Sequence, residues 1–307
     1  MEQDRYLARL GPPTQLFWIM LSALMGIALG SPNPAYARER VPVTDKAGAL
    51  EALHGLKSTD YFVHHSPSLR RPFHIYVKTP QNTTRTDQKL PVIYLLDGGE
   101  TFPIIAAYSH YLTFAEEMPE AIIVGISYGT DDPGNGNMRV TDFTAPSAEN
   151  AAYGGAEKFL SMIENELFPK VERDYPVDAN RRVLVGMSLG GQFILHAALE
   201  KPELFEGLIS VNPALHRNLQ HFVDALERAP SAPEKRKTLL YVVSTENDDP
   251  RFREPALKWI TLAKAKNGRP WCLYVDELGG ESHLSGLPRA FRNAMRWMHE
   301  ANPACEP

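Results

Sequence analysis

The chain has 307 residues, of which 43% are hydrophobic and 22% charged, a balance typical of a soluble globular protein with one large apolar core. Its formal net charge at pH 7 is -5, and the charges are spread along the sequence without a basic block. This distribution excludes a sequence-independent electrostatic grip on nucleic acid, so no nucleic-acid partner is expected.

The first 37 residues have the features of an export signal. Arg5 and Arg9 precede an apolar run over 16–29, and a small-x-small cleavage pattern ends at Ala37. The run is shorter than the roughly 20 residues that a membrane span needs, although an uncleaved membrane anchor is the alternative. We therefore predict a signal peptide over 1–37, a periplasmic or secreted protein, and no stable membrane anchor after signal removal.

From about residue 60 onward, apolar β-branched runs alternate with longer amphipathic stretches. This pattern predicts an α/β fold, a mostly parallel sheet with helices on both faces, within a single domain over 38–307. Strands are expected over 73–79, 90–97, 121–128, 181–187, 205–211, 238–244 and 271–278, several of them apolar throughout, as strands buried on both faces are. Helices are expected over 155–176, 191–205, 253–268 and 286–301.

Two long connections separate these elements, over 79–89 and 129–155. The second is too long for a plain connector in a compact domain, so it is expected to be a functional loop over a site or a mobile flap. Its segment DDPGNGN offers oxygen ligands but lacks the final glutamate and flanking helices of a calcium loop, and it is interpreted as a flexible turn.

Two cysteines, Cys272 and Cys305, follow the export signal. An oxidising compartment would permit a disulfide between the last strand and the C-terminal tail. Two unpaired thiols are the other possibility, and the sequence does not decide between them because it does not give the distance between the two Cα atoms.

Ser188 stands in the frame Gly186-Met187-Ser188-Leu189-Gly190, where an apolar strand ends and a helix begins. A nucleophile elbow needs this context, because the serine adopts a strained turn and small neighbours let strand and helix pass closely. A bare Gly-x-Ser-x-Gly is weak support, but the flanking elements favour a catalytic serine over a structural turn.

A base and an acid are available in the chain order that this elbow requires. His283 lies in a glycine-rich loop after the last strand, at the sheet edge where open α/β folds carry their sites, and is the predicted base. The turn after strand 238–244 offers three acids. Asp248 is favoured for orienting the imidazole, Glu246 is the next alternative, and Asp249 is left open.

The predicted oxyanion hole needs two N–H groups aimed at the developing charge. One is the backbone N–H of Leu189, directly after the nucleophile. The other is expected after the strand that ends at Asp97, from Gly99 or Glu100. The alternative is that this Asp-Gly-Gly stretch is only a tight turn.

Metal and nucleotide sites are not indicated. The sequence contains no His-Glu-x-x-His and no Gly-x-x-x-x-Gly-Lys-Ser/Thr, and the adjacent His64 and His65 would point to opposite faces of a strand. The predicted chemistry requires no metal or other cofactor.

Five motifs occur in an order known from one family: LPVIYLLDGGETF, AIIVGISYG, VLVGMSLGGQF, PELFEGLISVNPAL and ESHLSGLPRAFRNAMRWM. Together they resemble the putative-esterase family of α/β hydrolases, nearest the periplasmic enterobactin and salmochelin esterases, over residues 60 to 300. The resemblance implies the α/β-hydrolase fold and Ser188 with His283 as the catalytic pair. It also implies an oxyanion hole around Gly98 and Gly99, and an Arg139 that orders the long loop beside the site.

The chain departs from that family at two positions. Met187 stands where the family often has histidine, and His216 stands where an aromatic wall is usual, which argues against a pocket built for flat catechol rings. Ferric catecholates are anionic and would favour basic residues at the mouth, for which the candidates are Arg70, Arg71 and Arg139. Ordinary surface arginines are the alternative, and the net charge of -5 gives a basic site no support.

The leading hypothesis is an exported serine esterase that forms an acyl-enzyme on Ser188, with a siderophore trilactone as a candidate small-molecule substrate. An acyltransferase would use the same residues and differ in excluding water. A catalytically silent periplasmic binding protein of the same fold would predict a broken nucleophile or base, and both are present. The sequence leaves the oligomeric state open.

Overall fold

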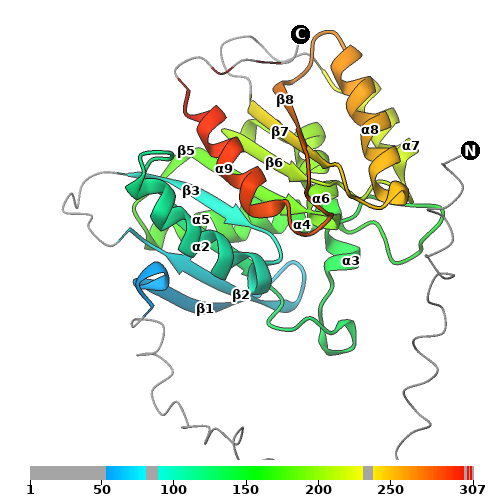
Figure 1. The fold of residues 1–307 in the computed structure, drawn as a ribbon. Coiled ribbons are helices and arrows are strands. Elements are labelled where there is room, and N and C mark those ends of the chain that lie inside the picture. Colours follow the sequence, from blue (N-terminus) through cyan, green and yellow to red (C-terminus); the bar gives the residue numbers. More distant parts are fainter. Residues whose placement is uncertain (1–52, 81–88, 231–237, 301–302, 304, 306–307) are drawn as a thin grey trace, which may run out of the picture. The chain divides into compact units, whose positions relative to one another are not determined.

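In the described part of the chain, eight strands form one sheet in the order β1-β2-β4-β3-β5-β6-β7-β8 (Figure 1). The computed structural model describes residues 53–80, 89–230, 238–300, 303 and 305, which all belong to one compact unit. The predicted signal peptide over 1–37 lies outside the described residues. The boundary between it and the predicted domain stays a prediction.

The first two strands of the sheet are antiparallel to their neighbours, and the six that follow are parallel. The strands are β1 (Thr59–Ser66), β2 (Arg71–Lys78), β3 (Leu90–Leu95), β4 (Ile122–Ser127), β5 (Val177–Met187), β6 (Gly207–Val211), β7 (Thr238–Thr245) and β8 (Trp271–Leu278). All seven predicted strands are among them. The prediction of a mostly parallel sheet is therefore confirmed.

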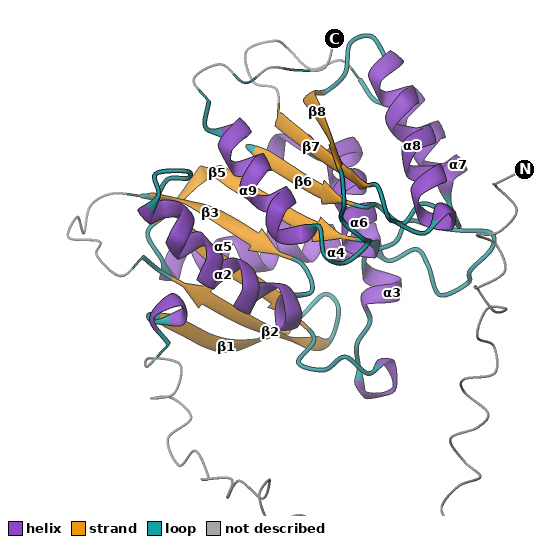
Figure 2. Ribbon diagram, viewed as in Figure 1, coloured by secondary structure: helices purple, strands orange, loops and turns teal. Residues whose placement is uncertain are grey.

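Helices cover both faces of the sheet (Figure 2). One face carries α2 (Gly98–Phe114) and α9 (Leu287–Met298). The other carries α4 (Ala156–Met162), α5 (Phe168–Asp174), α6 (Leu189–Glu200), α7 (Leu219–Arg228) and α8 (Pro250–Ala265). A π-helical turn (Ile163–Leu167) joins α4 to α5, and α3 (Arg139–Asp142) is a single turn. Short 3-10 turns lie at His54–Leu56, Pro133–Asn135 and Pro202–Leu204.

Most residues of the central strands β3, β4 and β6 are apolar and all are buried, because both faces of these strands are covered. In β3, Val92 and Tyr94 point into the core beneath α4, α5 and α6, whereas Ile93 and Leu95 point into the core beneath α2 and α9. The side-chain period of two along a strand produces this division. The sheet edge at which β3, β5 and β7 end is thereby fixed relative to helices on both sides.

Besides the single turn α3, three elements were not expected from the sequence. Strand β1 lies at the edge of the sheet and is mostly exposed, so it lacks the continuous apolar run of a central strand. Helix α2 begins with two glycines and contains Pro103, and such residues disfavour a helix. Helix α7 has a narrow apolar stripe between polar residues.

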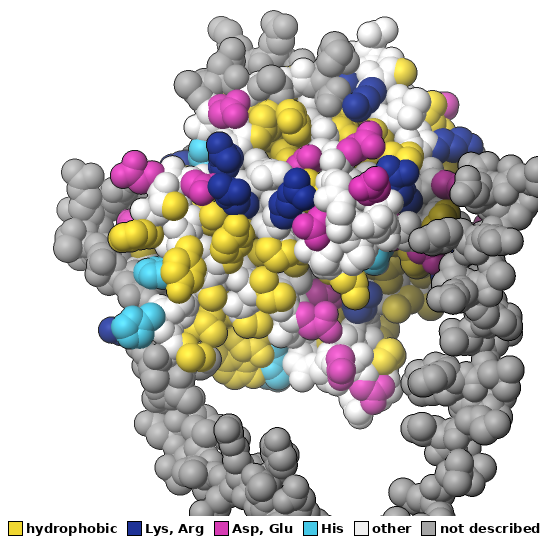
Figure 3. Space-filling model, viewed as in Figure 1, with side chains coloured by type: hydrophobic (Ala, Val, Ile, Leu, Met, Phe, Trp, Pro, Cys, Tyr) yellow, Lys and Arg dark blue, Asp and Glu magenta, His cyan; other side chains and the backbone are white. Residues whose placement is uncertain are grey.

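Exposed apolar side chains gather over α2 and β1 (Figure 3), at Tyr61, Val63, Ile104, Tyr111 and Phe114.

Cys272 and Cys305 form a disulfide, with their Cα atoms 5.2 Å apart. The bond ties β8 to the C-terminal tail, which is the first of the two possibilities that the sequence left open.

Among the described helices, none combines the length and the apolar character that crossing a bilayer requires.

His196, on α6, is a buried histidine whose titration should weaken the fold in acid. Its side chain is 7% exposed, and Nε2 has no hydrogen-bond partner in the described part of the chain. Burial, with a smaller contribution from His221, lowers the pKa of His196 from 6.5 to about 4. Between these two values the unfolded chain binds a proton that the folded chain does not. The free energy of unfolding should therefore fall as pH decreases from 6.5 to 4, by about 3 kcal/mol from this group.

Replacing His196 by leucine should remove this part of the acid sensitivity. Urea unfolding of wild type and His196→Leu at pH 7 and pH 4.5 measures it, and His65→Leu, at an exposed position on β1, is the control. The same loss of stability in wild type and His196→Leu between the two pH values would contradict the assignment.

Candidate active site

Ser188 occupies a sharp turn between β5 and α6. Its backbone has φ 59° and ψ -117°, a conformation that costs a non-glycine residue energy. The turn is held from outside, because the Ser188 N–H donates to the carbonyl of Val211 on β6 over 2.9 Å. The Ser188 carbonyl in turn accepts from the N–H groups of Gln192 and Ala214, each over 3.0 Å. The serine is thus presented at the carboxyl edge of the sheet.

The glycines around Ser188 are required by close approach. A Cβ at Gly186 would lie 2.5 Å from the backbone of Gly190, and a Cβ at Gly191 would lie 2.7 Å from the Val211 carbonyl. Both distances are too short for real atoms, so a side chain at either position would push strand and helix apart. This is the physical reason for the glycine pattern on which the elbow prediction rests.

The structure brings His283 and Asp248 together. His283 lies in the loop between β8 and α9, and Asp248 in the turn between β7 and α8. The Nδ1 atom of His283 is 2.9 Å from both carboxylate oxygens of Asp248. The Asp248 side chain is 3% exposed and the His283 side chain 19% exposed, so little water competes for this bond. The carboxylate is placed to orient the ring and to stabilise its protonated form.

The other two acids of the same turn have different partners. Glu246 accepts a hydrogen bond from the N–H of Gly280 over 3.0 Å, which shapes the loop that carries His283. Asp249 caps α8 by accepting from the N–H of Arg251 over 2.9 Å, and it also pairs with the Arg251 guanidinium. Of the three candidates, Asp248 is therefore the one in contact with the imidazole.

Asn212 links the loop that carries His283 to the end of β7, just before the turn that carries Asp248, and sequence reasoning did not identify it. It is buried, has φ 45°, and follows β6. Its side-chain NH₂ donates to the His283 carbonyl and its side-chain oxygen accepts from the Thr245 N–H, each over 2.9 Å. An asparagine before a proline at a strand end is the available signal, since asparagine tolerates positive φ and readily bonds nearby backbone.

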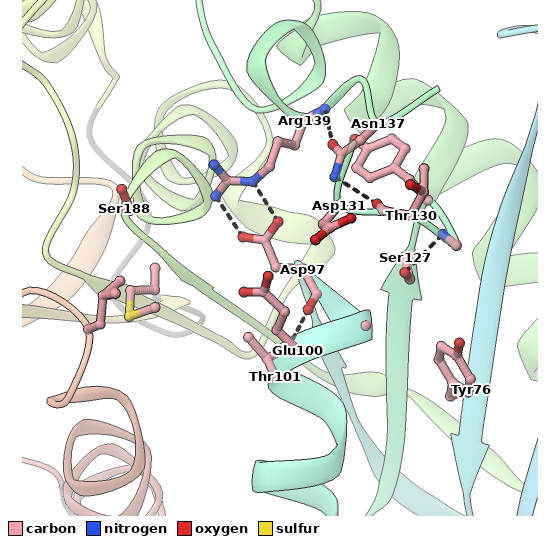
Figure 4. A pocket seen from close by; sticks show the side chains of 15 residues that line it. Tyr76, Asp97, Glu100, Thr101, Ser127, Thr130, Asp131, Asn137, Arg139 and Ser188 are labelled. Carbon is pink, nitrogen blue, oxygen red and sulfur yellow. Dashed lines mark hydrogen bonds and ion pairs between the residues drawn. The ribbon is translucent and has the colours of Figure 1, made fainter. Parts of the chain in front are cut away.

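Ser188 opens onto a cavity of about 510 Å³ (Figure 4). Met187 and Leu284, which flank the elbow and His283, also line it. In the described residues the Ser188 hydroxyl makes no direct hydrogen bond to the His283 ring, a bond that commonly tightens only when substrate is bound. The structure therefore places both residues at one edge of the sheet and pairs the ring with its acid.

The two predicted oxyanion donors begin two helices. Leu189 is the first residue of α6, so its N–H has no acceptor within the helix. Gly99 is the second residue of α2 and lines the Ser188 cavity. The Glu100 N–H donates to the carbonyl of Asp97 over 2.9 Å, so it is already engaged. This contact favours Gly99 over Glu100 among the two alternatives.

Two ion pairs fasten the long loop 129–155 beside the cavity. Arg139 on α3 donates from Nε and Nη2 to the two carboxylate oxygens of Asp97, over 2.7 and 2.8 Å. Asp142, one turn further on, is buried and accepts from Arg71 on β2 and from the Tyr128 hydroxyl, the latter over 2.8 Å. The loop is therefore docked against the sheet rather than free as a flap.

His216 does not line the cavity but takes part in a stack of rings behind His283. Its ring meets Phe252 edge-on at 4.8 Å, and Phe252 lies 4.9 Å from the His283 ring at an angle of 33°. Burial, and then the nearby Arg217 and Arg251, lower the pKa of His216. Phe252, which sequence reasoning also missed, packs against the face of the proposed base.

A serine elbow after the fifth strand of this sheet order, with an imidazole after the eighth strand, defines a hydrolase of the α/β-hydrolase fold. Residues 66–278 match the family described as Putative esterase, and the chain belongs to this family. The predicted resemblance and the predicted class, a carboxylic ester hydrolase, are confirmed at this level.

Relatives of known description include siderophore esterases. The ferri-bacillibactin esterase BesA of Bacillus subtilis (strain 168) is 30% identical over 262 residues, which cover 76% of this chain and 87% of that protein. The siderophore triacetylfusarinine C esterase of Aspergillus fumigatus is 35% identical over 143 residues, 42% of this chain and 46% of that protein. The structure of siderophore hydrolase EstB from Aspergillus nidulans has a TM-score of 0.69 at 21% identity, covers 81% of this chain and 97% of that one, and shows the shared fold.

Proposed function

We propose that this protein is an exported serine esterase that hydrolyses ester-linked siderophores. Ser188 attacks the ester carbonyl, and His283 takes the serine proton and passes it to the leaving alcohol. Asp248 orients the imidazole, while the N–H groups of Leu189 and Gly99 stabilise the oxyanion. Water then attacks the acyl-enzyme, the carboxylic acid leaves, and Ser188 regains its proton through His283.

The observation that carries this proposal is the 2.9 Å contact between His283 Nδ1 and the buried Asp248, on the same sheet edge as the strained Ser188. An imidazole with a carboxylate behind it is the arrangement that activates a serine hydroxyl. The siderophore part rests on the relatives, of which one is described as acting on ferri-bacillibactin and another on triacetylfusarinine C.

Export is supported by two independent features. Residues 16–37 contain the apolar run and the cleavage pattern described above. Cys272 and Cys305 are joined by a disulfide, and such bonds persist mainly outside the reducing cytoplasm. We therefore assign the mature protein to the periplasm or the extracellular space.

Covalent labelling tests the proposed nucleophile. Purified protein treated with a fluorophosphonate should gain one adduct by intact mass, and peptide mapping should find it on Ser188. Prior incubation with an ester substrate should slow the labelling, because substrate and label compete for one serine. Protein that stays unlabelled would support the silent binding protein instead, and labelling at another residue would exclude Ser188 as the nucleophile.

Product analysis then separates hydrolysis from acyl transfer. With para-nitrophenyl butyrate the protein should release butyrate, and added alcohols should divert only a minor share of the acyl group to new esters. Release of a siderophore's monomeric acid under the same conditions would support the proposed substrate. Complete diversion to the alcohol would instead identify an acyltransferase.

A further inference from the structure

Among the described residues that line the cavity beside Ser188, Arg139 is the only cation. Of the three arginines proposed from sequence to serve an anionic substrate, Arg139 alone lines it. The edge of the Arg139 guanidinium that carries Nε and Nη2 is bound to the Asp97 carboxylate, so the positive charge of Arg139 is paired with one of the acids of the cavity. Arg71 is paired with the buried Asp142, and Arg70 is exposed in the turn between β1 and β2. Of the three candidates, only Arg139 therefore lines the cavity, and the structure gives no basic mouth there among the described residues.

The described lining of this cavity carries more negative than positive charge. Asp97, Glu100 and Asp131 line it against the single guanidinium of Arg139, and Figure 4 shows the four side chains gathered there. Asp97 is paired with Arg139, whereas Glu100 and Asp131 form no ion pair with any described residue. The remaining polar lining consists of neutral hydroxyl and amide groups of Tyr76, Thr101, Ser127, Tyr128, Thr130, Asn137 and Ser188.

We infer that this cavity selects esters whose bound portion carries no negative charge. The inference rests on the proposed function, because it assigns the cavity to the substrate of Ser188. A ferric tris-catecholate carries three negative charges and would enter a cavity whose lining includes two exposed carboxylates, Glu100 and Asp131, that form no ion pair with any described residue. A ferric tris-hydroxamate is neutral, and so is an iron-free tris-catecholate at neutral pH. The cavity therefore favours hydroxamate or iron-free substrates over ferric catecholates.

The test compares three triesters under identical conditions: iron-free enterobactin, ferric enterobactin and ferric triacetylfusarinine C. The kcat/KM values of the two neutral substrates should exceed that of ferric enterobactin by about 10-fold or more, because two like charges at close range oppose binding. Raising the salt concentration from about 0.05 to 0.5 M should narrow the gap by screening that repulsion. Ferric enterobactin hydrolysed as fast as both neutral substrates would overturn the inference.

Charge-neutral variants locate the effect. In Glu100→Gln/Asp131→Asn, the ratio of kcat/KM for ferric enterobactin to that for ferric triacetylfusarinine C should rise by about 10-fold. The control Glu203→Gln/Glu254→Gln changes the net charge equally at exposed positions outside the cavity and should keep the wild-type ratio. A ratio that moves equally in both double variants would overturn the inference, since total charge would then be the cause.

Two simple esters, one neutral and one anionic, allow the charge preference of the cavity to be tested independently of whether siderophores are the substrate. If none of the three siderophores is cleaved, the siderophore part of the proposed function fails. The preference is then measured with para-nitrophenyl butyrate and the anionic para-nitrophenyl succinate. A preference for the neutral ester that is lost in Glu100→Gln/Asp131→Asn supports the inference, and equal kcat/KM values for the two esters overturn it.

Discussion

Replacing Ser188 by alanine is expected to lower kcat for para-nitrophenyl butyrate by about 10⁶-fold, the loss found when the nucleophile of a serine protease is removed. The hydroxyl oxygen of Ser188 would form the covalent bond to the acyl group in the acyl-enzyme. Binding and the two backbone N–H donors would remain and leave weak residual catalysis. Steady-state assays of the purified variant, with background hydrolysis subtracted, measure the loss of kcat.

The fold should tolerate this substitution. Alanine meets the same backbone strain at φ 59° as serine does, and in the described structure the Ser188 side chain caps no helix. Thermal unfolding of Ser188→Ala should therefore match wild type, and Ser161→Ala, at an exposed position on α4, serves as an activity control. Residual activity above about a tenth of wild type in a folded Ser188→Ala protein would rule out Ser188 as the nucleophile.

The elements that could be predicted from the sequence are those in which the local residue pattern matches the burial of the side chains. Strands such as β3 and β7 consist largely of apolar residues because helices cover both of their faces, and such runs are visible in the sequence alone. The elbow at Ser188 was also predictable, since steric contact forces glycine at Gly186 and Gly191. In each case a local constraint restricts which residue types can occupy the position.

Helix α2 could not be predicted in the same way, because its local preferences oppose its structure. Gly98, Gly99 and Pro103 all disfavour a helix, and tertiary packing against β4 overrides them. The consequence for the site is that the predicted oxyanion loop is the beginning of a helix. Its free N–H groups carry the positive end of the helix dipole, which suits a developing negative charge.

The identity of the acid and the role of Asn212 depend on contacts between distant segments. Glu246, Asp248 and Asp249 are equivalent as letters in one turn, and only the position of the His283 loop separates them. Asn212 holds that loop and the acid turn through one side chain, a relation between positions about 30 and 70 residues apart. A local pattern cannot contain such information.

Replacing Asp248 by asparagine is expected to lower kcat by about 10⁴-fold at neutral pH, as the equivalent change does in a serine protease. Asparagine has the shape of aspartate, so the buried site should stay packed. It lacks the negative charge that stabilises the imidazolium, and its amide can present an N–H to Nδ1, which would favour the wrong tautomer of His283. Steady-state kinetics with para-nitrophenyl butyrate across pH 5 to 9 measure the loss.

Glu246→Gln provides the matched comparison, because it makes the same chemical change two residues away. Glutamine can still accept the hydrogen bond from the Gly280 N–H, so the loop should keep its position and kcat should fall by no more than a few-fold. If Glu246→Gln proved the more damaging variant, Glu246 would be the acid, and the His283 loop would have to rearrange when substrate binds. A large loss of kcat in Asp248→Asn alone would mean that His283 and Asp248, which are already paired in the free protein, are also the pair that acts in catalysis.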